Sequence, residues 1–292
     1  MIERFTKRIL LLILGGSLTL SLSATELAAR SASAGKAALP TTLSGSTNSF
    51  RPLSPGPADG QIAFVTARLL ERFHYLRQPF NTPVSSKFFD RYLEALDPQH
   101  LHFLQSDLSE FESYRTNLDR LTLLQTDTRP ACEIFNRFMQ RLDQRVAYAD
   151  QLLQHEKFTF DTNERILINR KDAPYPKNLD EARKLWRERL RFEYLQERLG
   201  KIDAKKKAAA TAKTADAVTE AKPKKSEAED IIETLSHRYH RNLRTFADWD
   251  SDDVLQVYLT TLAHTYDPHS DYFGHAQLDS FAIGMNLSLF GI

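Results

Sequence analysis

The sequence predicts an all-α protein, and two observations lead to that prediction. Glycine is nearly absent from the middle of the chain, since Gly200 is the only one between Gln61 and Phe273. Tight hairpins and phosphate-binding loops need backbone at positive φ, which glycine supplies most readily. This stretch therefore excludes P-loop and GxGxxG sites and disfavours hairpins. Apolar residues also recur every three or four positions in successive segments, which is the spacing of one helical face.

Length, composition and charge set the broad class. The 292 residues, of which 41% are hydrophobic, suffice for one or two domains with a buried core and exclude disorder throughout. The net charge is only +1, but this sum hides a contrast between regions. Outside residues 1–60 and 201–225 the chain carries 25 basic and 32 acidic residues. Because this body is acidic, we expect no binding of nucleic acid.

The N-terminus has the three-part layout of a secretory signal. Basic residues precede an apolar run over 9–22, which is shorter than the ~20 residues of a membrane span. Small residues follow, with candidate cleavage points after Ala24 and within 32–34. We predict a signal peptide over 1–24, with an uncleaved membrane anchor as the alternative. Residues 25–60, rich in small residues and proline, are predicted to be a flexible lead-in.

The chain has a single cysteine, Cys132. It therefore has no internal disulfide, and no cysteine lies at a cleavage point to carry a lipid anchor. We expect Cys132 to be a buried, apolar residue on a helix.

The first two helices are predicted over 61–77 and 85–96. Proline residues follow both of them, and proline cannot continue a helix. One face of the first carries Ile62, Val65, Leu69, Phe73 and Leu76. The second carries Phe89, Tyr92, Leu93 and Leu96.

The third helix is predicted to begin at Ser106 or Asp107, which suit an N-cap, and the fourth at Pro130, which suits a first turn. The third has on one side Leu108, Phe111, Leu118 and Leu121. The fourth sustains the period over five turns, through Ile134, Phe135, Phe138, Leu142, Val146, Ala149 and Leu153.

A fifth helix, rich in Arg and Glu, is predicted from about Leu179 to Leu199, where Gly200 ends it. A Lys/Ala-rich insert of low complexity follows over 201–228. It has no aromatic residue in its basic run to stack on a base and no apolar stripe to enter a bilayer. We therefore expect a disordered, solvated loop.

The helical pattern resumes over 231–243 and again from Ser251, so that the predicted helical domain spans 61–284. Residues 285–292 alternate apolar and polar side chains, which predicts one β-strand. A lone strand has no partner for its backbone hydrogen bonds. We therefore expect this strand to begin a further, β-containing unit.

Candidate chemical sites are few. Ser33 and Lys36 fit the S-x-x-K pattern of some acyl-enzymes, but they lie in the lead-in, without the companion motifs. His264, His269 and His275 cluster with two aspartates and raise a metal hypothesis. Their spacing matches no zinc motif, and a proline between the aspartates breaks a calcium loop, so a structural turn is favoured.

The remaining histidines also favour structural roles. His237 and His240 lie three apart on a helix without a third ligand, which favours surface positions. His100 and His102 flank Leu101 in an apolar stretch, which favours packing. We assign no catalytic, cofactor-binding or metal-binding residue in this sequence and expect no cofactor.

Two segments resemble a known family. Residues Phe89–Tyr114, with the core ALDPQHLHFLQSDL, resemble the N-terminal domain of the tail-specific, or carboxy-terminal processing, proteases. The segment Tyr266–Phe273, YDPHSDYF, resembles the same domain, as does MNLSLFGI over 285–292, which in the family leads into a PDZ domain. The motifs fall in the family's order, and the resemblance covers about 61–292.

The resemblance implies a function. Family members are periplasmic serine endopeptidases that recognise apolar C-terminal tails through the PDZ domain and cut with a Ser/Lys dyad. The PDZ domain and the dyad would lie beyond Ile292, so no residue here inherits a catalytic role. The resemblance implies that the helical domain helps to form the vessel around the proteolytic core and docks adaptors or neighbouring subunits.

We therefore predict the non-catalytic N-terminal portion of such a protease, as a truncated product or a fragment, located in the periplasm and inactive alone. Its expected partners are protein substrates and envelope adaptor proteins, with membrane contact only through the signal segment. The sequence leaves the oligomeric state open. The alternative is a free-standing helical adaptor of the cell envelope.

Overall fold

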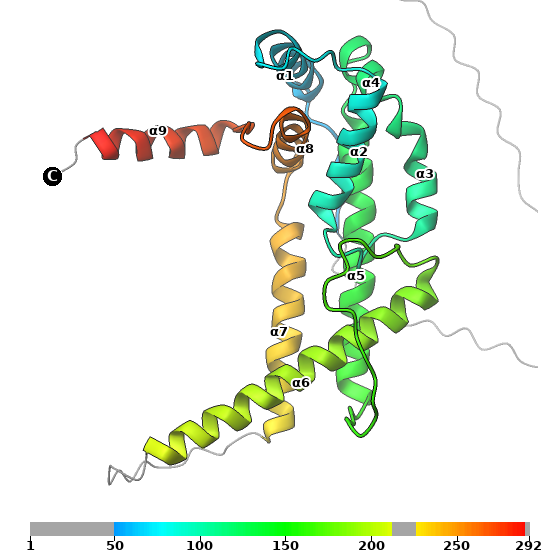
Figure 1. Ribbon diagram of the computed structural model, residues 1–292, viewed down its shortest axis with the longest axis vertical. Helices are drawn as coiled ribbons and strands as arrows, with labels where there is room; N and C mark the ends of the chain where they lie inside the picture. The colour runs from blue at the N-terminus through cyan, green and yellow to red at the C-terminus, as the bar shows by residue number, and fades with distance from the viewer. Residues whose placement is uncertain (1–49, 212–225, 290–292) are drawn as a thin grey trace, which may run out of the picture. The chain divides into compact units, whose positions relative to one another are not determined.

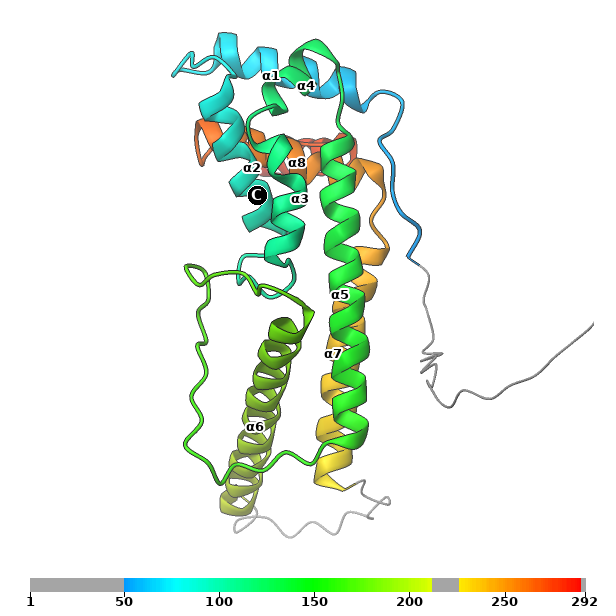
Figure 2. The ribbon, with the colours of Figure 1, turned by 90° about the vertical axis from the view of Figure 1, so that its right-hand side faces the viewer.

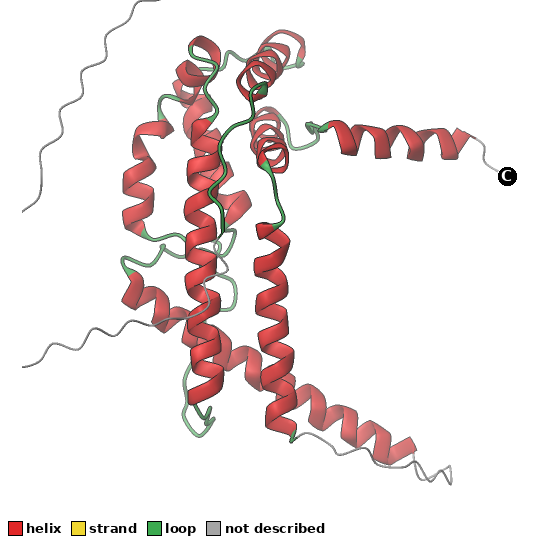
Figure 3. Ribbon diagram, turned by 180° about the vertical axis from the view of Figure 1, so that it is seen from behind, coloured by secondary structure: helices red, strands yellow, loops and turns green. Residues whose placement is uncertain are grey.

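The computed structural model describes residues 50–211 and 226–289. In these ranges the chain forms helices joined by loops and no strand, which confirms the predicted all-α class (Figure 3). The elements are α1 (Asp59–Phe73), α2 (Thr82–Leu96), α3 (Gln105–Arg115), α4 (Leu118–Leu124), α5 (Arg129–His155), α6 (Leu179–Thr211), α7 (Glu227–Ala247), α8 (Ser251–Tyr266) and α9 (His275–Leu289). None of the helices in these ranges is long and apolar enough to cross a membrane.

Helix α5 is the element around which the others pack. It contacts α2, α3, α6, α7 and α8, and Figure 2 shows α7 running alongside it. All seven apolar residues that the sequence places on this helix are buried, from Ile134 to Leu153, which confirms the predicted period. Further large contacts join α2 to α3 and α8, α6 to α7, and α1 to α4 and α8 (Figure 1).

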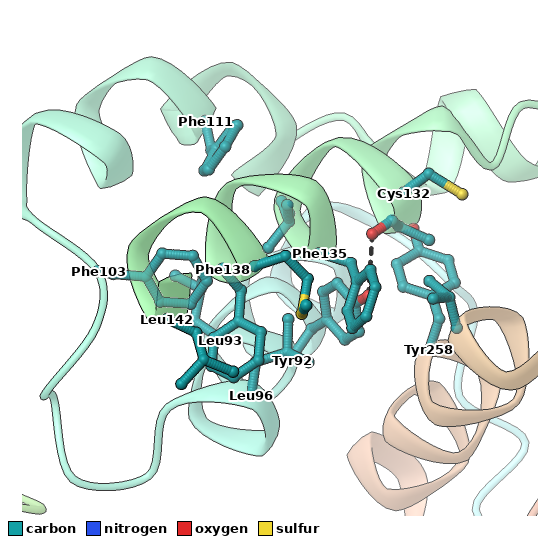
Figure 4. Close-up of a cluster of buried hydrophobic side chains, with 14 of the residues drawn as sticks. Tyr92, Leu93, Leu96, Phe103, Phe111, Cys132, Phe135, Phe138, Leu142 and Tyr258 are labelled. Atoms are coloured by element: carbon teal, nitrogen blue, oxygen red, sulfur yellow. Dashed lines mark hydrogen bonds between the residues drawn. The ribbon is translucent and has the colours of Figure 1, made fainter. Parts of the chain in front are cut away.

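The core between α2, α5 and α8 is aromatic (Figure 4). The rings of Phe88 and Tyr92 on α2 meet the ring of Tyr258 on α8, with centroids 4.5 and 5.0 Å apart. Tyr92 is fully buried, and its hydroxyl donates a hydrogen bond of 2.9 Å to the carbonyl of Ala131. Burial of large aromatic side chains supplies much of the stability of such a domain. The Tyr92 hydroxyl does not reduce this gain, because it forms a hydrogen bond.

The predicted third helix is divided in two. Helix α3 ends at Arg115 and α4 begins at Leu118, while Phe111 and Leu118 are both buried as predicted. The Asn117 amide group donates 2.7 Å to the carbonyl of Ser113, so a side chain takes up a carbonyl at the end of α3. Such local bonds compete with continued helix, which explains the break.

Both ends of the predicted insert over 201–228 are helical. Helix α6 runs through Gly200 to Thr211, and α7 begins at Glu227, so the prediction of a loop over 201–228 is wrong at both ends. A single exposed glycine costs a helix only about 1 kcal/mol, and the lysines and alanines that follow favour helix. Lys201 and Lys205 also pair with Asp230 and Glu227 of α7. Residues 212–225 lie outside the described ranges.

The predicted strand over 285–292 is not what the structure has. Residues 285–289 form the last part of α9, and 290–292 lie outside the described residues. A helix pairs its backbone groups within itself, whereas a strand needs a neighbouring strand, and the described part of the chain supplies none.

Helix α1 closely approaches the turn between α4 and α5 at Gly60. A Cβ atom at this position would lie 1.8 Å from the carbonyl oxygen of Thr126, which is backbone and has little freedom to move. By contrast, a Cβ atom at Gly200 would meet nothing within 4 Å. The two glycines therefore form a matched pair, one required by packing and one not.

We expect Gly60→Ala to destabilise the fold by about 1–3 kcal/mol, because α1 must move away from the turn before α5. Gly200→Ala should instead stabilise it by about 0.5–1 kcal/mol, because alanine favours helix. Urea unfolding followed by circular dichroism measures both. A Gly60→Ala protein as stable as the parent would contradict this account of the contact between α1 and the turn before α5.

Candidate functional site

The first family-like motif folds into a loop built on one buried carboxylate. Asp97, which is 1% exposed, follows the last residue of α2. Its Oδ1 accepts a hydrogen bond of 2.8 Å from the amide of Leu101, and its Oδ2 accepts from the amides of His102 and Phe103 at 2.8 and 3.0 Å. The carboxylate thereby fixes the loop over 97–104.

Contacts from distant parts of the chain hold this loop from outside. The indole of Trp186, buried on α6, donates 2.6 Å to the carbonyl of Leu101. The His100 ring stacks on Tyr175 at 3.8 Å, and its Nδ1 lies 2.5 Å from the carbonyl of Ala173. The loop therefore docks α6 and the segment before it onto the core.

A second buried carboxylate joins α3 to α5. Asp107 accepts 2.9 Å from the amide of Leu104 and two hydrogen bonds from Arg141, of 2.7 and 2.8 Å, with a further one from Arg137 at 2.5 Å. Burial alone would raise the pKa of this carboxyl, but the hydrogen bonds from Arg141, Leu104 and Arg137 together hold the pKa below its ordinary value. Asp107 is a charged clamp and stays ionised.

His102 lies inside the same loop, against Phe138 at 5.1 Å. Burial lowers its pKa to about 4, and nearby Arg145 lowers it as well, although Asp97 acts in the opposite direction. The ring is therefore neutral at neutral pH. The expected packing role of His100 and His102 is confirmed, because the His100 ring stacks on Tyr175 and the His102 ring meets Phe138 edge to face.

The second family-like motif forms the turn after α8. The Ser270 amide donates 3.1 Å to the carbonyl of Asp267, and its hydroxyl lies 3.3 Å from the Asp267 carboxylate. His264 pairs with Asp271 at 2.8 Å, which ties α8 to the segment that leaves the turn. The structure agrees with the structural turn favoured by the sequence.

The histidines are spread over separate contacts. His275 pairs with Asp279 on α9 at 3.1 Å, and His240 pairs with Asp150 at 2.7 Å, while His237 and His269 are exposed. No group of three potential metal ligands comes together within the ranges that the structure describes. The S-x-x-K residues Ser33 and Lys36 lie outside those ranges.

Cys132 is buried on α5, as predicted. Burial raises the pKa of its thiol to about 11, and Asp59 and Glu133 add to that effect. Because the thiolate is the reactive form, this residue is unsuited to act as a nucleophile.

One surface feature departs from the expected pattern. Of the five apolar residues predicted on one face of α1, only Ile62 packs against the core. The exposed ones, together with a neighbouring tyrosine, form a surface that we call the α1 stripe: Val65, Leu69, Phe73, Tyr75 and Leu76. Leu69 is 52% and Phe73 is 79% exposed.

The α1 stripe is exposed because α1 packs through small residues. Ala63 and Ala67 are fully buried and, with Gly60, allow α1 to lie close to α4 and α8. The sequence pattern therefore predicts burial of the wrong face of α1, because the larger apolar side chains lie on the exposed face. Exposed apolar patches of this kind are typical of protein-binding surfaces.

We expect Asp97→Ala to destabilise the fold on the order of 3 kcal/mol, because three buried amides lose their acceptor. Asp97→Asn should cost less, because its side chain keeps one acceptor oxygen. Thermal unfolding measures the change, and Asp161→Ala, at an exposed aspartate, is the matched control. Equal losses for the Asp97 and Asp161 alanine variants would contradict the role given to Asp97.

We expect His102 to lower the free energy of unfolding as the pH falls below about 6.5. Its pKa is about 4 in the folded state and about 6.5 unfolded, so the unfolded chain binds the proton first as pH falls. The stability is complete above the unfolded pKa and loses on the order of 3 kcal/mol as pH falls to 4. His102→Gln should flatten this part of the profile in urea titrations, and His269→Gln should not. Parallel profiles for the parent and His102→Gln would contradict the assignment.

Comparison with known proteins agrees with the motifs. Residues 66–276 match the family model described as "Tail specific protease N-terminal domain", a range that contains both the Asp97 loop and the turn after α8. The chain is also similar to the tail-specific protease of Haemophilus influenzae, with 32% identity over 229 residues. That match covers 78% of this chain and 29% of the relative, so the chain spans well under half the length of that relative. The chain belongs to the tail-specific protease family, and residues 66–276 correspond to the N-terminal domain of that family.

Proposed function

We propose that this chain provides the non-catalytic, N-terminal helical part of a periplasmic carboxy-terminal processing serine endopeptidase. The observation that carries the proposal is the match of residues 66–276 to the N-terminal domain of the family. The predicted signal over 1–24, which lies outside the described residues, supports export to the periplasm.

We expect no proteolysis by this chain alone. Buried carboxylates of the first family-like motif serve the fold, because Asp97 and Asp107 hold backbone amides and arginines. The thiol of Cys132 is buried and protonated. None of these groups has the exposed, activated character of a nucleophile.

The proposed contribution of the domain is contact with protein substrates and envelope adaptors. The α1 stripe supports this role because it presents large apolar side chains to solvent beside polar ones. Its aromatic residues, Phe73 and Tyr75, are of the types that are enriched at interfaces.

A free-standing helical adaptor is the second candidate. It is favoured by the core of the described residues, which joins α1, α2, α5, α7 and α8 in one buried cluster. A domain with its own core does not need a catalytic partner to fold.

We expect the purified chain to bind an unfolded protein with an apolar C-terminus and to leave it intact. Fluorescence anisotropy of the labelled protein measures binding, and mass spectrometry detects cleavage. Turnover that a serine-protease inhibitor blocks would overturn the non-catalytic role.

A double variant tests the surface. Leu69→Ser with Phe73→Ser should weaken binding about tenfold or more, since truncation of central apolar anchors costs about 2 kcal/mol. Leu167→Ser with Ile168→Ser removes two other exposed apolar side chains and is the matched control. Equal binding by both double variants would remove the α1 stripe from the proposal.

A further inference from the structure

A pocket between α5, α6 and α7 concentrates positive charge. Arg145 of α5 and Arg238 and Arg241 of α7 line it, with Glu193 of α6 as its acidic group. Tyr239 and Asn242 add a hydroxyl and an amide to the lining. These helices contact one another in pairs, so their packing sets the positions of the three arginines.

Arg145 is the unusual member of this group. Its side chain is buried, with the residue 8% exposed, yet no carboxylate in the described part of the chain forms an ion pair with it. Its guanidinium contacts neutral groups: Nη1 lies 3.3 Å from His102 Nε2, and Nη2 lies 3.5 Å from the Tyr239 hydroxyl. Nε has no hydrogen-bond partner.

The contacts of Arg145 do not compensate its charge. Distances of 3.3 and 3.5 Å lie at the long limit for hydrogen bonds. The Tyr239 ring, whose centroid is 5.3 Å from the guanidinium carbon, gives a modest cation–π attraction. The His102 ring is neutral, as its burial requires. A buried charge without a counter-ion is costly, so this arrangement favours an anion in the pocket.

The neighbouring charges leave the pocket positive. Glu193 is engaged by Arg189 of its own helix at 3.1 Å, and its carboxylate also hydrogen-bonds the Tyr239 hydroxyl. Arg238 pairs with Glu197. Arg241 is exposed and lines the same pocket as Arg145.

We propose that this pocket binds a phosphate group. The guanidinium groups of Arg145 and Arg241, which have no carboxylate partner among the described residues, and the Asn242 amide offer more donors than the two oxygens of a carboxylate can accept. A phosphate has more acceptor oxygens and more charge, and arginine forks match it well. The group belongs either to free phosphate or to a phosphate ester.

The test uses the full 292-residue chain and inorganic phosphate as the probe, at constant ionic strength. Isothermal titration calorimetry should detect saturable binding, and Tm should rise with phosphate. Arg145→Met and Arg241→Gln should each weaken binding about tenfold or more, since hydrogen bonds to charged groups contribute about 1.5–3 kcal/mol. Arg120→Gln, at an exposed arginine of α4, is the matched control and should bind like the parent.

Several outcomes separate the proposal from a purely structural role for Arg145. Met fills a similar volume without charge, so Arg145→Met should keep the Tm of the phosphate-free parent while it loses the response to phosphate. Arg241 is exposed, so Arg241→Gln tests the pocket without a change in the core. Glycerol phosphate distinguishes the sources, because tight binding of it assigns the pocket to esters and weak binding assigns it to free phosphate. No heat with phosphate, equal binding of acetate, or unchanged binding by both arginine variants would overturn the proposal.

Discussion

The Asp97 carboxylate is the interaction on which the rest of the domain depends. The Asp97 side chain, directly after α2, accepts from three consecutive amides and so gives the loop over 97–104 a single conformation. That conformation presents the Leu101 carbonyl to Trp186 and directs the Phe103 ring into the core. Docking of α6 follows from the loop, because α6 meets the loop through its own buried tryptophan.

The same loop lies between an apolar part of the core and a charged one. The core between α2, α5 and α8 is apolar and aromatic, whereas Asp107 with Arg137 and Arg141 is a buried charged clamp. A carboxylate that accepts from two arginines and an amide has its desolvation largely offset. The clamp therefore fixes the direction of α3 relative to α5 in a way that apolar contacts, which have no directional preference, do not.

Much of the fold could be predicted from the sequence because its signals are local. The period of α5 holds over more than five turns, and every predicted apolar position on it is buried. The burial of α1 could not be predicted, because Ala63 and Ala67 give a weaker signal than Leu69 and Phe73 on the exposed face. The extension of α6 past Gly200 depends on the helix propensity of lysine and alanine and on contacts with α7. The low-complexity composition of this segment predicted a disordered loop instead.

The roles of the motif residues were also beyond the sequence. Trp186 and Leu101 are 85 positions apart, and no periodicity links them. The family-like motif around Asp97 resembles a site because it is rich in Asp and His, yet its polar groups point at backbone amides and aromatic rings. A chain of this family can thus be identified by residues that build the domain, while residues of potential binding function, such as Arg145, lie outside the motifs.

Arg145 stands where an apolar residue would satisfy packing. It occupies the helical position between Leu142 and Ala149 on a face that is otherwise apolar, and the surrounding core does not supply a carboxylate to match it. Arg141, four residues before Arg145 on the same helix, is a purely structural arginine. It makes bidentate contact with the buried Asp107 carboxylate. Two arginines one turn apart therefore meet the same physical requirement in different ways. Arg141 finds its counter-ion within the chain, and the charge of Arg145 is left for a ligand to neutralise.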